Sequence, residues 1–186
     1  MRKFLFFLFA ITLGIGVAIF RIANIENSDA FFHNGSWIGS NSLPLGKNNL
    51  VTAQITVFGL FALPSEEAIY LFARRDDKNE LLSGDADYEI FGNINQMKAK
   101  YWSITIYGKD LYLIENEVDK FSFNQSNVQA DSLGNFSILV SAKRHERNWL
   151  PSKSNGRFNL VLRIYDGEKQ FISNLEQADL PKIKQI

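Results

Sequence analysis

The chain has 186 residues with 20 basic and 20 acidic side chains and no cysteine. This length suffices for one buried core but is short for two, so we expect one folded domain. The absence of cysteine excludes disulfides, thiolate zinc sites, iron–sulfur clusters and cysteine nucleophiles. Without the N-terminal residues Arg2, Lys3, Arg21 and Glu26, the chain has 17 basic and 19 acidic residues. No nucleic-acid partner is indicated, because phosphate binding needs a clustered cationic excess.

The N-terminal segment has the composition of a membrane-spanning helix. An uncharged run of 17 residues, Phe4 to Phe20, lies between Met1-Arg2-Lys3 and Arg21. Such a helix is about 26 Å long, enough for a hydrocarbon core of about 30 Å when the flanking basic groups reach the interfaces. We predict a single-pass transmembrane anchor over residues 1–23, with residues 4–20 in contact with the bacterial inner membrane.

The charges around this run predict its orientation. Arg2, Lys3 and the α-amine outweigh Arg21, so the N-terminus should stay in the cytoplasm and the C-terminal domain should lie in the periplasm. A cleaved signal peptide is the alternative, but Gly16-Val17-Ala18 lies inside the apolar run and Ser28-Asp29-Ala30 lies ten residues beyond it. The uncleaved signal anchor is therefore favoured.

Residues 24–49 are rich in Asn, Ser and Gly, which is typical of a tether. Its aromatic residues Phe31, Phe32 and Trp37 would be unusual in a solvated linker, so we expect the tether to pack partly on the domain. The folded domain is predicted over residues 50–186.

A helix is predicted at the start of this domain, over residues 50–63. Val51, Ile55, Phe58 and Ala62 recur at helical spacing, and Pro64-Ser65 ends the segment. The β-branched residues of the same segment also permit a strand.

Beyond residue 67 the apolar period changes to two, and turn residues such as Asn155-Gly156 separate the alternating segments. With 16 Phe, 6 Tyr and 3 Trp, the composition suits strands better than a helical bundle. We predict a mainly β fold, a sandwich or a barrel, with one or two short helices, namely residues 50–63 and a short turn near residues 174–179. The predicted strands are Ala68–Arg74, Tyr88–Phe91, Tyr101–Tyr107, Phe121–Asn124, Phe136–Ser141 and Phe158–Tyr165.

Alternation assigns the faces of the two longest strands. One face should carry the apolar side chains, and Arg163 should lie on the other face, beside Tyr165. The residues predicted on the apolar face are Trp102, Ile104, Ile106, Phe158, Leu160, Leu162 and Ile164.

The C-terminal part of the chain resembles the bacterial domain of unknown function 1214 family, over about residues 85–186. The resemblance implies a jelly-roll-like antiparallel β-sandwich, and it implies no reaction. Short members of the family carry an N-terminal membrane helix, and larger members carry a further N-terminal domain. The matching stretches are YWSITIYGKD (101–110), KFSFNQSNV (120–128), DSLGNFSILVS (131–141), NWLPSKSNGRFNLVLRIY (148–165) and LPKIKQI (180–186).

The best candidate for a ligand site combines Tyr107, Trp149, Arg163 and Tyr165. A fixed cation with aromatic walls is typical of carbohydrate, carboxylate or peptide pockets. The alternative, which we favour, is structural: Trp149 packs as a hydrophobic plug and Arg163 satisfies neighbouring acceptors.

Other chemistry has weaker support. Asp85, Asp87 and Glu89 form an alternating acidic row, which suits glycoside hydrolysis or calcium binding but is more often the solvated face of an edge strand. His33 and His145 are the only histidines, and no metal-ligand spacing is present, so no metal and no cofactor are predicted.

The functional prediction follows from the predicted location of the domain, which is attached to the periplasmic side of the inner membrane. We expect a membrane-anchored periplasmic binding or assembly module of the bacterial envelope, whose partner is a separate chain resembling the missing N-terminal half of larger family members. The alternative is a periplasmic hydrolase acting on a glycan or small ester. No catalytic motif is found, and the sequence leans against an enzyme.

Overall fold

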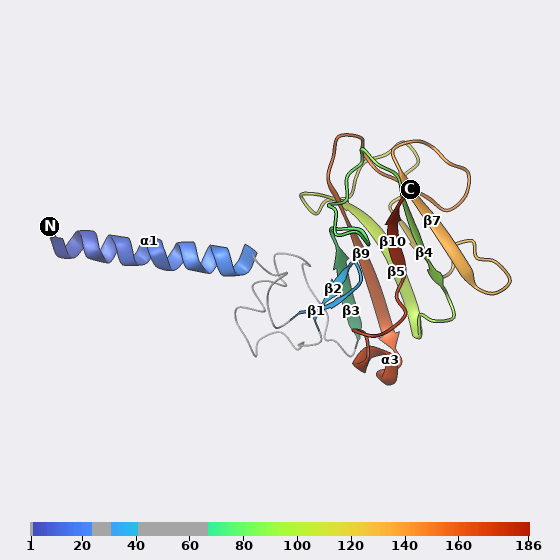
Figure 1. The fold of residues 1–186 in the computed structure, drawn as a ribbon, viewed down its shortest axis with the longest axis horizontal. Helices are drawn as coiled ribbons and strands as arrows, with labels where there is room; N and C mark the ends of the chain where they lie inside the picture. Colours follow the sequence, from blue (N-terminus) through green and yellow to red (C-terminus); the bar gives the residue numbers. More distant parts are fainter. Residues whose placement is uncertain (1, 24–30, 41–66) are drawn as a thin grey trace.

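A computed structural model describes residues 2–23, 31–40 and 67–186 of the chain (Figure 1). Helix α1 spans Arg2–Ala23, and its part Arg2–Arg21 is long and apolar enough to cross a membrane. The side chains of this part are exposed on all sides, whereas the helix of a soluble core buries an apolar face. The predicted helix over residues 50–63 lies outside the described residues.

The described residues beyond α1 form two packed β-sheets (Figure 1). The six-stranded sheet has, in spatial order, β1 (Phe32–Asn34), β2 (Trp37–Gly39), β3 (Ala68–Ala73), β9 (Phe158–Gly167), β5 (Ala99–Gly108) and β6 (Ser122–Asn124). The four-stranded sheet has β10 (Lys182–Gln185), β4 (Tyr88–Asn93), β7 (Asn135–Ser141) and β8 (Trp149–Pro151). All neighbours pair antiparallel except β7 and β8, which are parallel.

This architecture confirms the predicted mainly β sandwich, with one parallel pair where the prediction was antiparallel throughout. Each of the six predicted strands is present as β3, β4, β5, β6, β7 or β9. The strands β1, β2, β8 and β10 were not predicted, because their three or four residues do not repeat the alternation of apolar and polar side chains. Residues 32–39, which the sequence places in a tether packing partly on the domain, form β1 and β2 of the six-stranded sheet.

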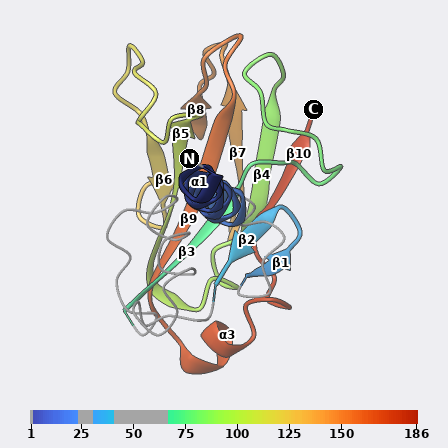
Figure 2. The same ribbon diagram turned by 90° about the vertical axis from the view of Figure 1, so that its left-hand side faces the viewer.

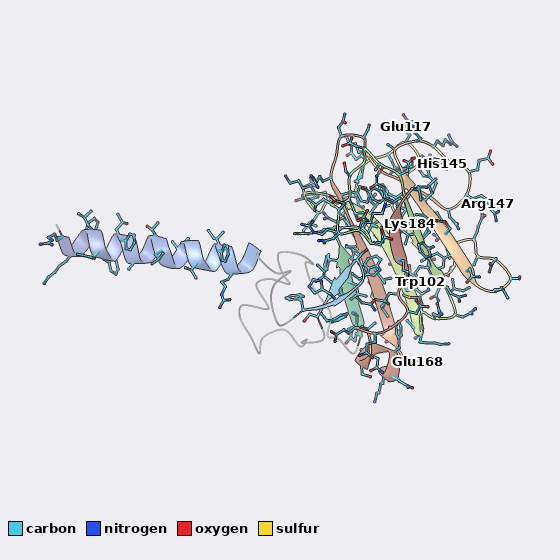
Figure 3. All side chains as sticks on the ribbon, in the orientation of Figure 1. Trp102, Glu117, His145, Arg147, Glu168 and Lys184 are labelled. Carbon is cyan, nitrogen blue, oxygen red and sulfur yellow. The ribbon has the colours of Figure 1, made fainter. Side chains whose placement is uncertain are left out.

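The core lies between the two sheets and confirms the predicted apolar face. Trp102 stacks on Phe136 with ring centroids 5.3 Å apart, and Tyr88 meets Phe158 edge to face at 5.6 Å. Each pair joins one sheet to the other, and Figure 3 shows Trp102 between the sheets. The seven residues predicted on the apolar face are all buried: Trp102, Ile104, Ile106, Phe158, Leu160, Leu162 and Ile164.

The two ends of the sandwich differ. At one end β9 runs into the short helix α3 (Lys169–Ser173) and then into a turn. The second short helix was predicted near residues 174–179, a few residues later than α3. At the opposite end lie the loop that follows β5 and the loop that precedes β9 (Figure 2). Gly108 pairs with Phe158 there, so the register of β5 and β9 brings these two loops together.

Candidate functional site

Arg163 connects three strands on the outer face of the six-stranded sheet. Its guanidinium donates to Thr105 Oγ1 at 3.0 Å and to the Tyr107 hydroxyl at 2.6 Å. The rings of Tyr70 and Tyr107 lie 5.9 and 5.4 Å from its Cζ, within the range of cation–π attraction. The half-buried side chain of Arg163 therefore ties β9 to β5 and contacts β3.

The structure brings together only part of the predicted aromatic cluster. Tyr165 lies against Tyr101, with ring centroids 5.7 Å apart. Trp149 belongs to β8 in the four-stranded sheet, where its indole N–H donates to the Ser141 carbonyl at 2.9 Å. Arg163 and Tyr107 do meet, and Trp149 is on the other sheet, so the four residues do not form one pocket.

A large hollow lies at the end of the sandwich opposite α3. It is an open groove of about 1310 Å³ between the loop after β5 and the loop before β9. Hereafter it is called the end groove. Its lining residues are Gly108, Lys109, Asp110, Tyr112, Leu113, Ile114, Glu115, Phe121, Lys153, Asn155, Gly156 and Arg157.

One wall of the end groove is a tight turn at the end of β5. The Gly108 N–H donates to the Tyr112 carbonyl at 2.8 Å, and Asp110 Oδ1 accepts the Tyr112 N–H at 3.2 Å. Leu111 takes a φ of +66°, which is unfavourable for a residue with a side chain. Asn159 Nδ2 donates to the Gly108 carbonyl at 2.9 Å and fixes the turn to β9.

The other wall is the segment 153–157, which is fixed in part by a hydrogen bond to Asp85 of the acidic row. Asp85 Oδ1 accepts the Asn155 N–H at 2.8 Å, and the Gly84 N–H donates to the Gly156 carbonyl at 2.8 Å. A Cβ added to Gly84 would collide with the Lys153 carbonyl oxygen, so only glycine permits this approach. Both walls are therefore fixed by backbone hydrogen bonds.

The end groove presents charge and aromatic surface together. Lys109, Lys153 and Arg157 are exposed and form no ion pair in the part of the chain that the structure describes. Two carboxylates also line it, but that of Asp110 accepts a hydrogen bond within its own turn. Tyr112 is 76% exposed, so its ring is available at the rim.

The acidic row does not form a carboxylate pair. Asp85 lies before β4 and faces the segment 153–157, whereas Glu89 Oε1 accepts from the Ser137 hydroxyl of β7 at 2.6 Å. The interpretation as an edge strand is wrong, because β4 lies between β10 and β7. Within the described ranges no group of three or more histidine and acidic residues is placed to hold a metal ion.

Two ionisable groups near the loops have shifted pKa values. Burial lowers the pKa of Lys120, whose ammonium lies 4.0 Å from the centre of the Phe123 ring. The pKa of Asp131 is lowered by its hydrogen bonds, first from the Asn135 side chain and then from backbone N–H groups. The Asp131 carboxylate accepts hydrogen bonds within its own turn, and neither group lines the end groove.

The sequence analysis grouped Arg163 with Tyr107, which do form a hydrogen bond, but it missed the lining of the end groove. The relevant segments, Gly108-Lys109-Asp110 and Asn155-Gly156, carry turn residues, which by themselves indicate only that the chain reverses there. Their proximity follows from the pairing of β5 with β9, which alternation alone does not give. A basic residue beside each of these turns was the signal available.

The fold and this groove define a two-sheet β-sandwich whose loops enclose an open polar groove at one end. Residues 67–169 match the family described as "Protein of unknown function (DUF1214)", and the chain belongs to that family. The match begins before the predicted resemblance over 85–186, because it includes β3, and it ends within α3. No functionally curated protein matches the chain.

Solved structures that are similar to this chain include two bacterial proteins. The VPA0106 protein from Vibrio parahaemolyticus is 28% identical, with a TM-score of 0.60 over 75% of this chain. An uncharacterised protein from Burkholderia cenocepacia is 16% identical, with a TM-score of 0.46 over 91% of this chain. The chain spans 35% of the Vibrio protein and 39% of the Burkholderia protein.

Proposed function

We propose that this chain is a membrane-anchored binding module of the bacterial envelope. In this proposal α1 stays in the inner membrane, the sandwich lies in the periplasm, and the end groove recognises an envelope component. The observation that carries the proposal is the groove itself, whose walls are fixed by backbone hydrogen bonds. These walls carry an exposed tyrosine and three cations that have no ion-pair partner among the residues the structure describes. Fixed walls favour recognition because little ordering is needed on binding.

The apolar helix supports the location. Arg2–Arg21 covers about 30 Å as a helix, which matches the hydrocarbon core of a bilayer. The excess of basic charge at its N-terminal end favours export of the residues that follow it. A module attached in this way meets its ligand at the membrane surface.

Photo-crosslinking tests the binding proposal. A crosslinking amino acid replaces Tyr112, which is 76% exposed, and in a matched control it replaces Leu133, which is 72% exposed in the loop before β7. We expect a specific adduct in intact envelopes from position 112, lost when Lys109 and Lys153 are changed to glutamine. Equal adducts from both positions, or none from position 112, would contradict the proposal.

A second candidate function, assembly with a separate chain, is favoured by one comparison. This chain spans only 35% of the Vibrio protein, so the equivalent domain there is joined to further polypeptide. We propose a partner that resembles that further part. Native electrophoresis of gently extracted membranes should give a complex larger than one copy or a homo-oligomer, and a species containing this chain alone would contradict the assembly.

A further inference from the structure

We propose that the end groove binds an acidic sugar chain, an oligosaccharide whose rings carry carboxylates. This inference rests on the proposed binding function and names the chemical class of its ligand. Three properties of the groove carry it: its charge, its exposed aromatic ring and its open shape.

The charge of the groove suits a ligand with spaced anionic groups. Lys109 lies on one wall, and Lys153 and Arg157 lie on the other. None of them has a carboxylate partner among the described residues, so each can pair with a ligand carboxylate. Cations on both sides of a groove favour a chain with several carboxylates over a compact ligand with one.

Tyr112 supplies the contact that sugars need beyond charge. Its ring is 76% exposed, and the turn that carries it is fixed by hydrogen bonds to Gly108 and Asp110. A tyrosine ring has an apolar body and a polar tip, so it packs on the C–H face of a sugar while its hydroxyl stays hydrated. Leu113 and Phe121 extend the apolar surface beside it.

The size and the backbone of the groove favour a sugar chain over other polymers. Its volume of about 1310 Å³ exceeds that of small-molecule pockets, which is about 300–1,000 Å³, and it is open to solvent. Peptides often add to a free strand edge, but here Tyr107 already pairs with Leu113 beside the end of β5. Nucleic acid is disfavoured, because acidic residues outnumber basic ones after residue 27.

Calorimetry on the full chain in detergent micelles tests this inference with two matched probes. The first probe is a short oligogalacturonate, and the second is the same oligosaccharide with its carboxylates methyl-esterified. We expect binding of the acid, weakened by added salt, and binding of the ester that is weaker by about tenfold. Equal binding of both probes would overturn the acidic class while leaving the groove as a sugar site.

Matched variants locate the binding. The double variant Lys109→Gln with Lys153→Gln should weaken binding of the acid by about fivefold or more. The control, Lys182→Gln with Lys184→Gln, removes the same charge from β10 of the other sheet, where Lys184 is labelled in Figure 3, and should leave binding unchanged. Tyr112→Ala should weaken binding of both probes.

The outcomes separate this inference from the proposed function. If neither probe binds, or if the β10 control weakens binding as much as the groove variant, the acidic sugar chain is excluded. A position-112 adduct that persists in that case would keep the groove as a binding site for another ligand. Loss of both the adduct and the sugar binding would overturn both proposals.

Discussion

Arg163 is the residue at which a site and a scaffold are most directly distinguished. Its hydrogen bonds go to Thr105 and Tyr107, and the rings of Tyr70 and Tyr107 lie nearby. These are contacts within the sheet, which supports the structural role that the sequence analysis favours. The role still stands as a prediction, and a stability measurement tests it.

We expect Arg163→Met to lower the free energy of unfolding by about 1–3 kcal/mol, because two acceptors lose a donor and the cation–π contacts are lost. Thermal and urea unfolding, followed by the buried Trp102, would measure this. Tyr107→Phe should cost less, since it removes one of the two hydrogen bonds. A melting temperature that stays level or rises in Arg163→Met would show that this side chain is not structural.

At the residue scale, the sequence predicted which face Arg163 occupies but not its partners. Alternation places its side chain on the face of the sheet that does not carry Leu162 and Ile164, as observed. Its contact with Thr105 depends on the register of β9 against β5, in which Arg163 pairs with Ser103 across the two strands. Register follows from packing and turn geometry across distant segments, so a single strand's pattern could not supply it.

At the scale of elements, the acidic row offers an internal control for the wall of the end groove. Asp85 accepts the Asn155 N–H and the Ser83 hydroxyl, at 2.8 and 2.9 Å. For Asp87, two residues along the same row, the structure gives no side-chain hydrogen bond among the described residues. Truncating each residue should therefore have different effects.

We expect Asp85→Ala to loosen the segment 153–157 and to lower the free energy of unfolding by about 1 kcal/mol, since it removes hydrogen bonds to a charged acceptor at an exposed position. Amide hydrogen exchange should quicken at Asn155. Asp87→Ala should leave that exchange rate unchanged. Equal protection of Asn155 in both variants would mean that Asp85 does not hold the wall.

The sequence predicted four strands of six or more alternating residues and two shorter strands, Tyr88–Phe91 and Phe121–Asn124. β5 and β9 have ten residues each, and both were found, with ends within two residues. β8 and β10 were missed because neither short segment repeats the alternation of apolar and polar residues. The end groove was missed for a related reason, since turn residues identify where the chain reverses but not which turns meet.

At the scale of the whole molecule, the sequence predicted the sandwich because composition and period agree from Ala68 to Tyr165. The sequence did not predict the order in which the strands pair within each sheet. β9 lies between β3 and β5, although nearly fifty residues separate it from the end of β5. Such pairings join distant segments of the chain, so local pattern carries little information about them.

Membrane topology is the prediction that belongs to this scale. An enzyme that is active only outside the cytoplasm, fused after residue 40, should be active, and the full chain should remain in the membrane pellet. The physical reason is that Arg2 and Lys3 resist translocation while the apolar helix satisfies its own backbone in the bilayer. Arg2→Glu with Lys3→Glu should reduce reporter activity, since Arg21 then carries the dominant positive charge.

Cleavage would give a different pattern, which makes the topology test decisive. A signal peptide would release the sandwich to osmotic shock, with a mature N-terminus near Ile19 or Phe31. The anchor instead predicts one species of full length that detergent releases and that salt or alkaline washing does not. A helix of about 20 apolar residues leaves a bilayer only when its whole surface is exposed to water, at a cost of about 25 cal/mol for each Å². Washing cannot supply that free energy, so recovery of the sandwich in a salt wash would mean that α1 does not span the membrane.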